Sequence, residues 1–102
     1  MGITFNPQSS DVNDNAYLSG TVTVGTSAVE AKVGGSALAE REMVRIHNIS
    51  NSTVYFGPSG VTTSSGEPLY KNQWVSLPAG PNNPVYLIRA SGSSDVIVQE
   101  MS

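Results

Sequence analysis

The sequence contains no cysteine. Without cysteine the chain can form neither a disulfide framework nor a thiolate metal site, which excludes the small secreted scaffolds that disulfides hold together. The fold must therefore be stable through its own hydrophobic core. With 102 residues, 38% of them hydrophobic, the chain has enough apolar side chains for a single sandwich or barrel domain.

Charged residues are scarce, and their balance is slightly acidic. Only 13% of the residues are charged, five are Lys or Arg, and the formal net charge is −3. So few basic residues cannot form the positive stripe that neutralises a nucleic-acid backbone, and we expect no nucleic-acid partner. The chain also lacks an apolar run of membrane-spanning length and a signal-peptide pattern at its start, so we expect no membrane association.

Residue patterns that carry catalysis or bind metal are equally sparse. His47 is the only histidine, and no activated nucleophile or oxyanion motif accompanies it. Residues 11–15 resemble the start of a calcium loop, but Ala16 stands where the sharp turn requires Gly and Val22 stands where a closing Glu is required. We therefore predict that the protein is not an enzyme and uses no metal and no cofactor.

What the chain does contain is an apolar period of two, which is typical of β-strands. It is clearest in residues 42–61, where two alternating segments flank an Asn- and Ser-rich turn sequence at residues 48–52. We predict a β-hairpin there, closed at its far end by the turn sequence of residues 57–60. The Asn side chains of the first turn are expected to bond their own backbone rather than to carry glycans.

Similar alternation predicts strands along the rest of the chain, and the predicted pairs are again hairpins. Pro68 should keep its segment at a sheet edge, because proline cannot donate to a ladder. The further strands are expected at residues 17–24, 27–33, 73–77, 85–90 and 95–101. The predicted core residues are Val44, Ile46, Val54, Phe56, Val75, Leu77, Ile88 and Val96.

Seven to eight short strands without a credible helix predict an all-β fold. The expected architecture is an antiparallel β-sandwich with a jelly-roll-like or immunoglobulin-like layout, and a closed barrel is the alternative. Residues 17–102 are assigned to this single domain. Residues 1–16 are polar apart from a short apolar run at Ile3 and Phe5. We predict that they form an extended N-terminal arm, because Ile3 and Phe5 need a place to bury, and a frayed terminus is the alternative.

The late strands carry apolar residues on both of their faces. If Val75 faces the core then Trp74 faces away, and if Ile88 faces the core then Val85 and Leu87 face away. Apolar residues that face away from the core must be covered by another part of the chain or by a neighbouring subunit. The candidate interface residues are Ile3, Phe5, Trp74, Val85 and Leu87.

Five segments together carry a family resemblance. They read GTVTV at residues 20–24, AVEAKVG at 28–34, VRIHN at 44–48, VYFGPSGV at 54–61 and PVYLI at 84–88. This pattern resembles small virion proteins of tailed bacteriophages, and the stretch at 54–61 is its most recognisable part. Such proteins are β-sandwich accessory components of the particle, either head decoration (cement) proteins or pieces of the neck and tail, and they offer no catalytic residues to transfer.

The resemblance implies a non-enzymatic virion structural protein, made in the host cytoplasm. The first interpretation is a capsid decoration protein that stabilises the assembled head, with further copies of itself and the major capsid protein or other virion proteins as partners. The alternative is a tail, neck or fibre module that binds a partner subunit or a bacterial surface carbohydrate. In that case Tyr70, Trp74, Tyr86 and the loop at residues 78–84 would supply the contacts.

Overall fold

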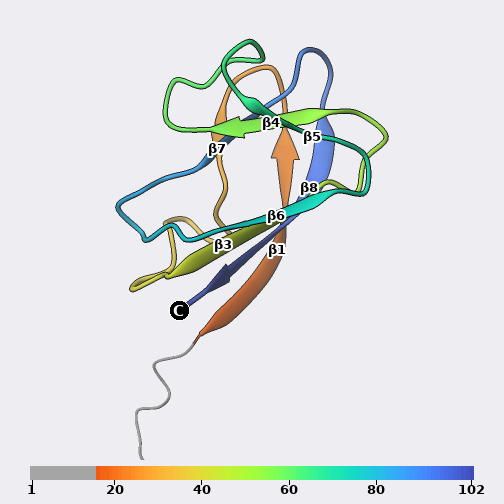
Figure 1. The fold of residues 1–102 in the computed structure, drawn as a ribbon. Helices are drawn as coiled ribbons and strands as arrows, with labels where there is room; N and C mark the ends of the chain where they lie inside the picture. The colour runs from red at the N-terminus through yellow and green to blue at the C-terminus, as the bar shows by residue number, and fades with distance from the viewer. Residues whose placement is uncertain (1–15) are drawn as a thin grey trace, which may run out of the picture.

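The computed structural model describes residues 16–102. This part of the chain contains no helix, and its eight strands form two antiparallel sheets that share one core (Figure 1). The predicted all-β sandwich is confirmed. The closed barrel is wrong, because the strands belong to two separate sheets with free edges. The arm predicted for residues 1–16 lies, except for its last residue, outside the described residues.

Each sheet has four strands. Sheet A has the order β1 (Tyr17–Val24), β8 (Ser94–Met101), β3 (Met43–His47) and β6 (Trp74–Leu77). Sheet B has the order β2 (Val29–Glu30), β7 (Tyr86–Ile88), β4 (Val54–Gly57) and β5 (Glu67–Leu69). Strand β1 has the predicted bounds, whereas the strand predicted for residues 27–33 shrinks to two residues.

The strands pair in a nested order. Strand β1 pairs with β8, β2 with β7, β3 with β6, and β4 with β5, always antiparallel, and successive pairs alternate between the two sheets. This is the path of one long hairpin, closed between β4 and β5 and folded over on itself, which is the jelly-roll arrangement. The jelly-roll form of the predicted sandwich is therefore the correct one.

Three predicted hairpins are wrong, because the two strands of each lie in different sheets. Strands β3 and β4, β1 and β2, and β7 and β8 follow one another in sequence but pair elsewhere. A short connection that crosses the roughly 10 Å between packed sheets has the same turn-forming composition as one that closes a hairpin. The local pair is β4 with β5, and Pro68 lies on β5, an edge strand, as predicted.

The core lies between the two sheets, and most of its predicted members are confirmed. Val44, Ile46, Val54 and Val96 are fully buried. Three more predicted core residues are half-buried and pack against the same cluster: Phe56, Val75 and Leu77.

Strand β7 faces the opposite way from the prediction. Leu87 lies opposite Phe56 and is fully buried, and Val85 is buried as well, whereas Ile88 lies opposite Tyr55 and is only half-buried. Because side chains alternate with a period of two, a shift of one residue exchanges the two faces. Val85 and Leu87 are therefore core residues, and their assignment to an outward-facing interface was wrong.

The turn after β4 folds back over sheet B. Val61 is buried outside the main core, and a Cβ added at Gly57 or Gly66 would lie 2.7 or 2.9 Å from the Val61 Cγ2. These glycines let the loop approach the sheet closely. The segment at 54–61 therefore has a structural role in closing the β4–β5 hairpin.

Candidate interaction site at the edge of the sandwich

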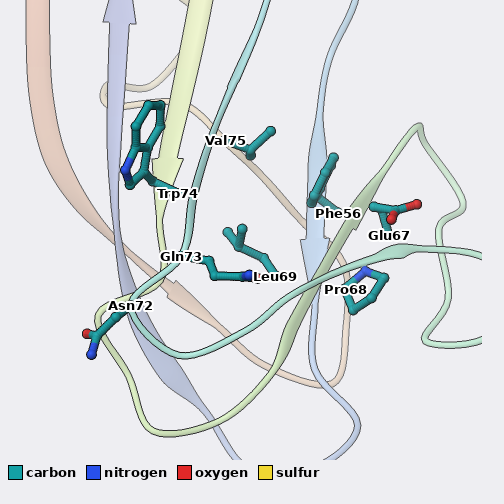
Figure 2. A pocket seen from close by; sticks show the side chains of 8 residues that line it. All are labelled: Phe56, Glu67, Pro68, Leu69, Asn72, Gln73, Trp74 and Val75. Carbon is teal, nitrogen blue, oxygen red and sulfur yellow. The ribbon is translucent and has the colours of Figure 1, made fainter.

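A groove opens where the edges of the two sheets meet. Strands β5 and β6 are the outer strands of sheet B and sheet A, and the short segment 70–73 connects them. The groove has a volume of about 470 Å³, within the range of roughly 300–1,000 Å³ that is typical of ligand pockets. Figure 2 shows its lining residues: Phe56, Glu67, Pro68, Leu69, Asn72, Gln73, Trp74 and Val75.

The floor of the groove is apolar and its rim is polar. Leu69 belongs to the core cluster, and Phe56 and Val75 pack against that cluster. The rim carries Glu67 and Gln73, both exposed, and the Gln73 Oε1 accepts a 2.9 Å hydrogen bond from the Tyr70 N–H. The groove therefore offers both apolar contacts and polar partners to a ligand.

Trp74 lies beside the groove, on the outer face of sheet A. Its side chain is 56% exposed and points away from Phe56 and Val75 (Figure 2). The outward orientation of Trp74 is the one that its alternation with Val75 predicted. The Arg45 guanidinium carbon lies 4.2 Å from the centroid of the Trp74 ring, which is a cation–π distance. Arg45 thus lies over one face of a large exposed aromatic ring.

Other apolar side chains share this outer face. In the register of the sheet, Thr21, Ile97, His47 and Trp74 lie side by side across all four strands. The next apolar group lies at the other end of the sheet, where Tyr17, Met101 and Met43 are neighbours, and Tyr17 and Met43 are 64% and 37% exposed. The outer face of sheet A is therefore a mixed apolar and polar surface.

His47 is half-buried on this same face, and its cross-strand neighbours are Trp74 and Ile97. Neither neighbour is a carboxylate or a hydroxyl that would form a catalytic pair with it. In the part of the chain that the structure describes, no group of three or more His, Cys, Asp or Glu residues is placed to hold a metal ion. Nor does any helix within residues 16–102 have the length and apolar character to cross a membrane.

The predicted site residues that lie within residues 16–102 are not brought together. Ile3 and Phe5 lie outside the described residues. Tyr70 is 53% exposed in the segment before β6, close in sequence to Trp74. Tyr86 points outward from sheet B, since its neighbour Leu87 points into the core, so Tyr86 and Trp74 lie on opposite outer faces.

A cluster of polar side chains is buried inside the sandwich. The Arg41 Nη1 donates a 2.8 Å hydrogen bond to the Glu100 Oε2, and both side chains are fully buried. The Glu100 carboxylate also accepts hydrogen bonds from the backbone N–H groups of Val33 and Leu38, at 2.9 and 3.0 Å. Burial by itself raises the pKa of the Glu100 carboxyl, but these backbone hydrogen bonds and the Arg41 guanidinium outweigh it, so the pKa lies below its ordinary value of 4.5.

The rest of the Arg41 guanidinium holds the loop after β6. Its Nε donates to the Ala79 carbonyl at 2.8 Å and its Nη2 donates to the Gly80 carbonyl at 2.9 Å. Each of the three nitrogens of the Arg41 guanidinium therefore donates to an acceptor, as a buried arginine requires. Because the cluster is enclosed and its hydrogen bonds run to loop backbone, its role is to anchor the loops 31–41 and 78–83 to β8.

This cluster was not predicted from the sequence, although one of its two residues carries a recognisable pattern. Glu100 follows Val96 and Val98 at a spacing of two, and this spacing places it on the buried face of the final strand. Nothing comparable marks Arg41, which lies in a loop. Asn48, in contrast, fulfils its prediction as a turn residue, because its Oδ1 accepts a 3.0 Å hydrogen bond from the Ser50 N–H.

The candidate site thus consists of the groove, the edge strand β6, which has no further strand beside it within residues 16–102, and an exposed Trp–Arg pair. Trp and Arg are both residue types that are enriched where proteins bind other proteins. Compared with protein-family models, curated proteins and solved structures, the chain matches none of them.

Proposed function

We propose that this chain is a non-enzymatic structural protein of a tailed-bacteriophage virion, and that it binds the assembled capsid as a decoration protein. The observation that carries the proposal is the Trp74–Arg45 pair, a large exposed ring held by a guanidinium beside a free sheet edge. Truncating a Trp or an Arg at the centre of a protein interface commonly costs 2 kcal/mol or more in binding, by order of magnitude. An exposed pair of this kind is therefore well suited to contact another subunit.

The fold and the sequence pattern support this assignment. The jelly roll is a common architecture of viral capsid domains, although it also occurs in lectins and in enzymes, so the fold alone does not assign a function. The resemblance to phage virion proteins adds to it independently. Its most recognisable segment, residues 54–61, forms β4 and the turn that carries the buried Val61.

The N-terminal arm supplies the second contact in this proposal. Residues 1–16 are polar apart from a few side chains, and the apolar Ile3 and Phe5 would bury on a neighbouring subunit, so that the arm acts as a clasp. The partners would be copies of the same chain and the major capsid protein or another virion protein.

Co-sedimentation with particles that lack this protein tests the proposal. Full-length protein should bind and sediment with the particles, whereas Trp74→Ala and a chain without residues 1–10 should bind more weakly. Ile49→Ala is the matched control, because Ile49 is a similarly exposed apolar residue, 48%, in the turn after β3. Thermal melts of all four proteins separate loss of binding from loss of folding.

Two results would contradict the proposal. If the full-length protein does not sediment with any particle fraction of its phage, the virion assignment fails. If Trp74→Ala and the truncated chain both bind as well as the parent, the protein attaches through another surface.

Carbohydrate binding is the second candidate, and the exposure of two aromatic residues favours it. Trp74 and Tyr70 are each more than half exposed and flank the polar segment at residues 71–73. Exposed aromatic rings next to amide groups are a common platform for sugars. Binding of the isolated protein to polysaccharide from the host surface, lost in Tyr70→Ala and in Trp74→Ala, would favour this candidate over decoration.

A further inference from the structure

Strand β6 has a free side that lies along the groove. It is the outer strand of sheet A, next to β3 and with no further strand beyond it among the described residues. A free edge of this kind is a template for pairing with another strand. Addition of an extended segment to such an edge is a recurrent mode of protein recognition.

The register identifies which backbone groups of β6 are free. The Asn48 N–H donates to the Gln73 carbonyl at 2.9 Å, so this pair is hydrogen-bonded across β3 and β6. Bonded pairs alternate along an antiparallel ladder, which makes Val75 a bonded residue as well. Trp74 and Ser76 therefore direct their N–H and C=O groups outward, away from β3.

A strand added beside β6 would also cover the groove. Its inward-pointing side chains would continue the row that contains Val75, and they would lie over the apolar floor formed with Phe56 and Leu69. Its outward-pointing side chains would lie beside Trp74 and Ser76. The site thus selects a segment with apolar residues two positions apart and a small or polar residue between them.

The arm of this chain contains such a segment. Ile3 and Phe5 are separated by Thr4, so in an extended strand both apolar side chains lie on one face and the threonine lies on the other. Residues 1–15 precede the described part of the chain, which begins just before β1. We propose that residues 3–5 of a second copy add to β6 as an antiparallel strand and place Ile3 and Phe5 in the groove.

The position of the arm favours a second copy over the same copy. Strands β1 and β6 are opposite edges of sheet A, and Tyr17 aligns with Met43, at the end of the sheet where β6 finishes. The residues between Phe5 and Tyr17, fully extended, reach roughly 33–36 Å for each ten residues, which is long enough to cross the sheet. If these residues took the shortest path across that end of the sheet, however, residues 3–5 of the same copy would run parallel to β6.

All strand pairs among the described residues are antiparallel. A segment from another molecule approaches β6 in either direction, so it can pair antiparallel without a reversal of the chain. Because the donor segment and the acceptor groove are different parts of the chain, copies would associate head to tail. This inference shares the arm with the proposed function but concerns the free protein, so either can fail without the other.

Disulfide trapping tests the inference directly, because the natural chain has no cysteine. Full-length protein carrying Thr4→Cys is mixed with a mass-tagged full-length chain carrying Ser76→Cys and oxidised gently. Ser76 is exposed on β6, and the substitution Thr4→Cys does not alter Ile3 or Phe5. Neither substitution therefore removes a predicted contact. The control chain carries Thr26→Cys, at an exposed turn between β1 and β2, the edge strands on the opposite side of both sheets.

The expected result is a disulfide-linked heterodimer that forms at least about tenfold more with Ser76→Cys than with Thr26→Cys, because docking raises the effective thiol concentration. Adding Ile3→Ser and Phe5→Ser to the Thr4→Cys chain should remove the excess. Equal yields for the two acceptor chains would overturn the inference. Trp74→Cys, at the other β6 position beside which an outward-pointing side chain of the added strand would lie, repeats the measurement if Ser76→Cys lowers the melting temperature.

A further experiment distinguishes binding of residues 3–5 to their own copy from binding to a second copy. A chain that carries both Thr4→Cys and Ser76→Cys is oxidised over a range of dilutions. Crosslinked dimers that disappear on dilution support exchange between copies. A crosslinked monomer whose yield is independent of concentration would place the arm on its own β6 and overturn the proposal of a second copy.

Discussion

The guanidinium of Arg41 and the carboxylate of Glu100 form a fully buried ion pair with a 2.8 Å hydrogen bond, although 59 residues separate them in sequence. The pair ties the loop before β3 to the final strand. Through its other nitrogens Arg41 also holds the loop after β6. One polar cluster thus connects three segments that are far apart in sequence.

Removing one partner of this ion pair should destabilise the domain strongly. Glu100→Gln keeps the size of the side chain but leaves the Arg41 charge buried without a counter-charge, and we expect the free energy of unfolding to fall by about 3–5 kcal/mol. Urea unfolding monitored by circular dichroism measures the loss. The control is Glu42→Gln, at an exposed position next to the same loop, which should change the free energy by less than about 0.5 kcal/mol.

Replacing both partners should be milder than replacing either one. Arg41→Met combined with Glu100→Leu leaves no buried charge, so the double variant should lose less free energy than the two single variants added together. Additive losses would contradict the view that the cost comes from an uncompensated charge.

Stability should fall in acid partly because of Glu100. Its pKa in the folded protein lies below the ordinary value of 4.5 that applies after unfolding, so between these two values the unfolded chain binds more protons. The contribution of Glu100 is therefore complete above pH 4.5 and is lost as the pH falls through the lower pKa of the folded state. Melting temperatures of the parent and of Glu100→Gln between pH 6 and pH 3 should converge towards acid, and parallel curves would contradict this assignment.

The orientation of β7 gives a prediction with a built-in control. Leu87→Ala removes a fully buried side chain and should cost about 2–5 kcal/mol. Ile88→Ala, one residue along the same strand, removes a half-buried side chain that points outward and should cost less than half as much. Denaturant unfolding of the two variants compares them, and the reverse order would restore the orientation that the sequence pattern first indicated.

The loop over sheet B depends on the absence of a side chain at Gly66. A Cβ there would lie 2.8 Å from the Tyr55 Cβ and 2.9 Å from the Val61 Cγ2, closer than side chains pack, so Gly66→Ala should cost about 1–3 kcal/mol. Gly35→Ala is the control, because a Cβ at Gly35 meets nothing within 4 Å. If the melting temperatures of the two variants are equal, the loop 58–66 does not pack against the sheet as described.

Local sequence was sufficient for the class of the fold and for several positions in it. The period of two is a property of each strand, and it identified β1 with its correct bounds and the outward orientation of Trp74. The ring of Pro68 removes a donor whatever the partner is, so its place on an edge strand was also predictable. These features depend on residues that are close together along the chain.

The pairing of the strands and the candidate site were decided by the tertiary structure. Alternation shows that a strand has two faces, but where both faces are apolar, as in β7, it does not show which face is buried. It also does not show which strand lies beside it, as for β3 and β4. The Arg41–Glu100 pair and the groove between β5 and β6 arise only when distant segments meet. Their free energy comes from contacts between residues far apart in sequence, and a local pattern carries no record of those contacts.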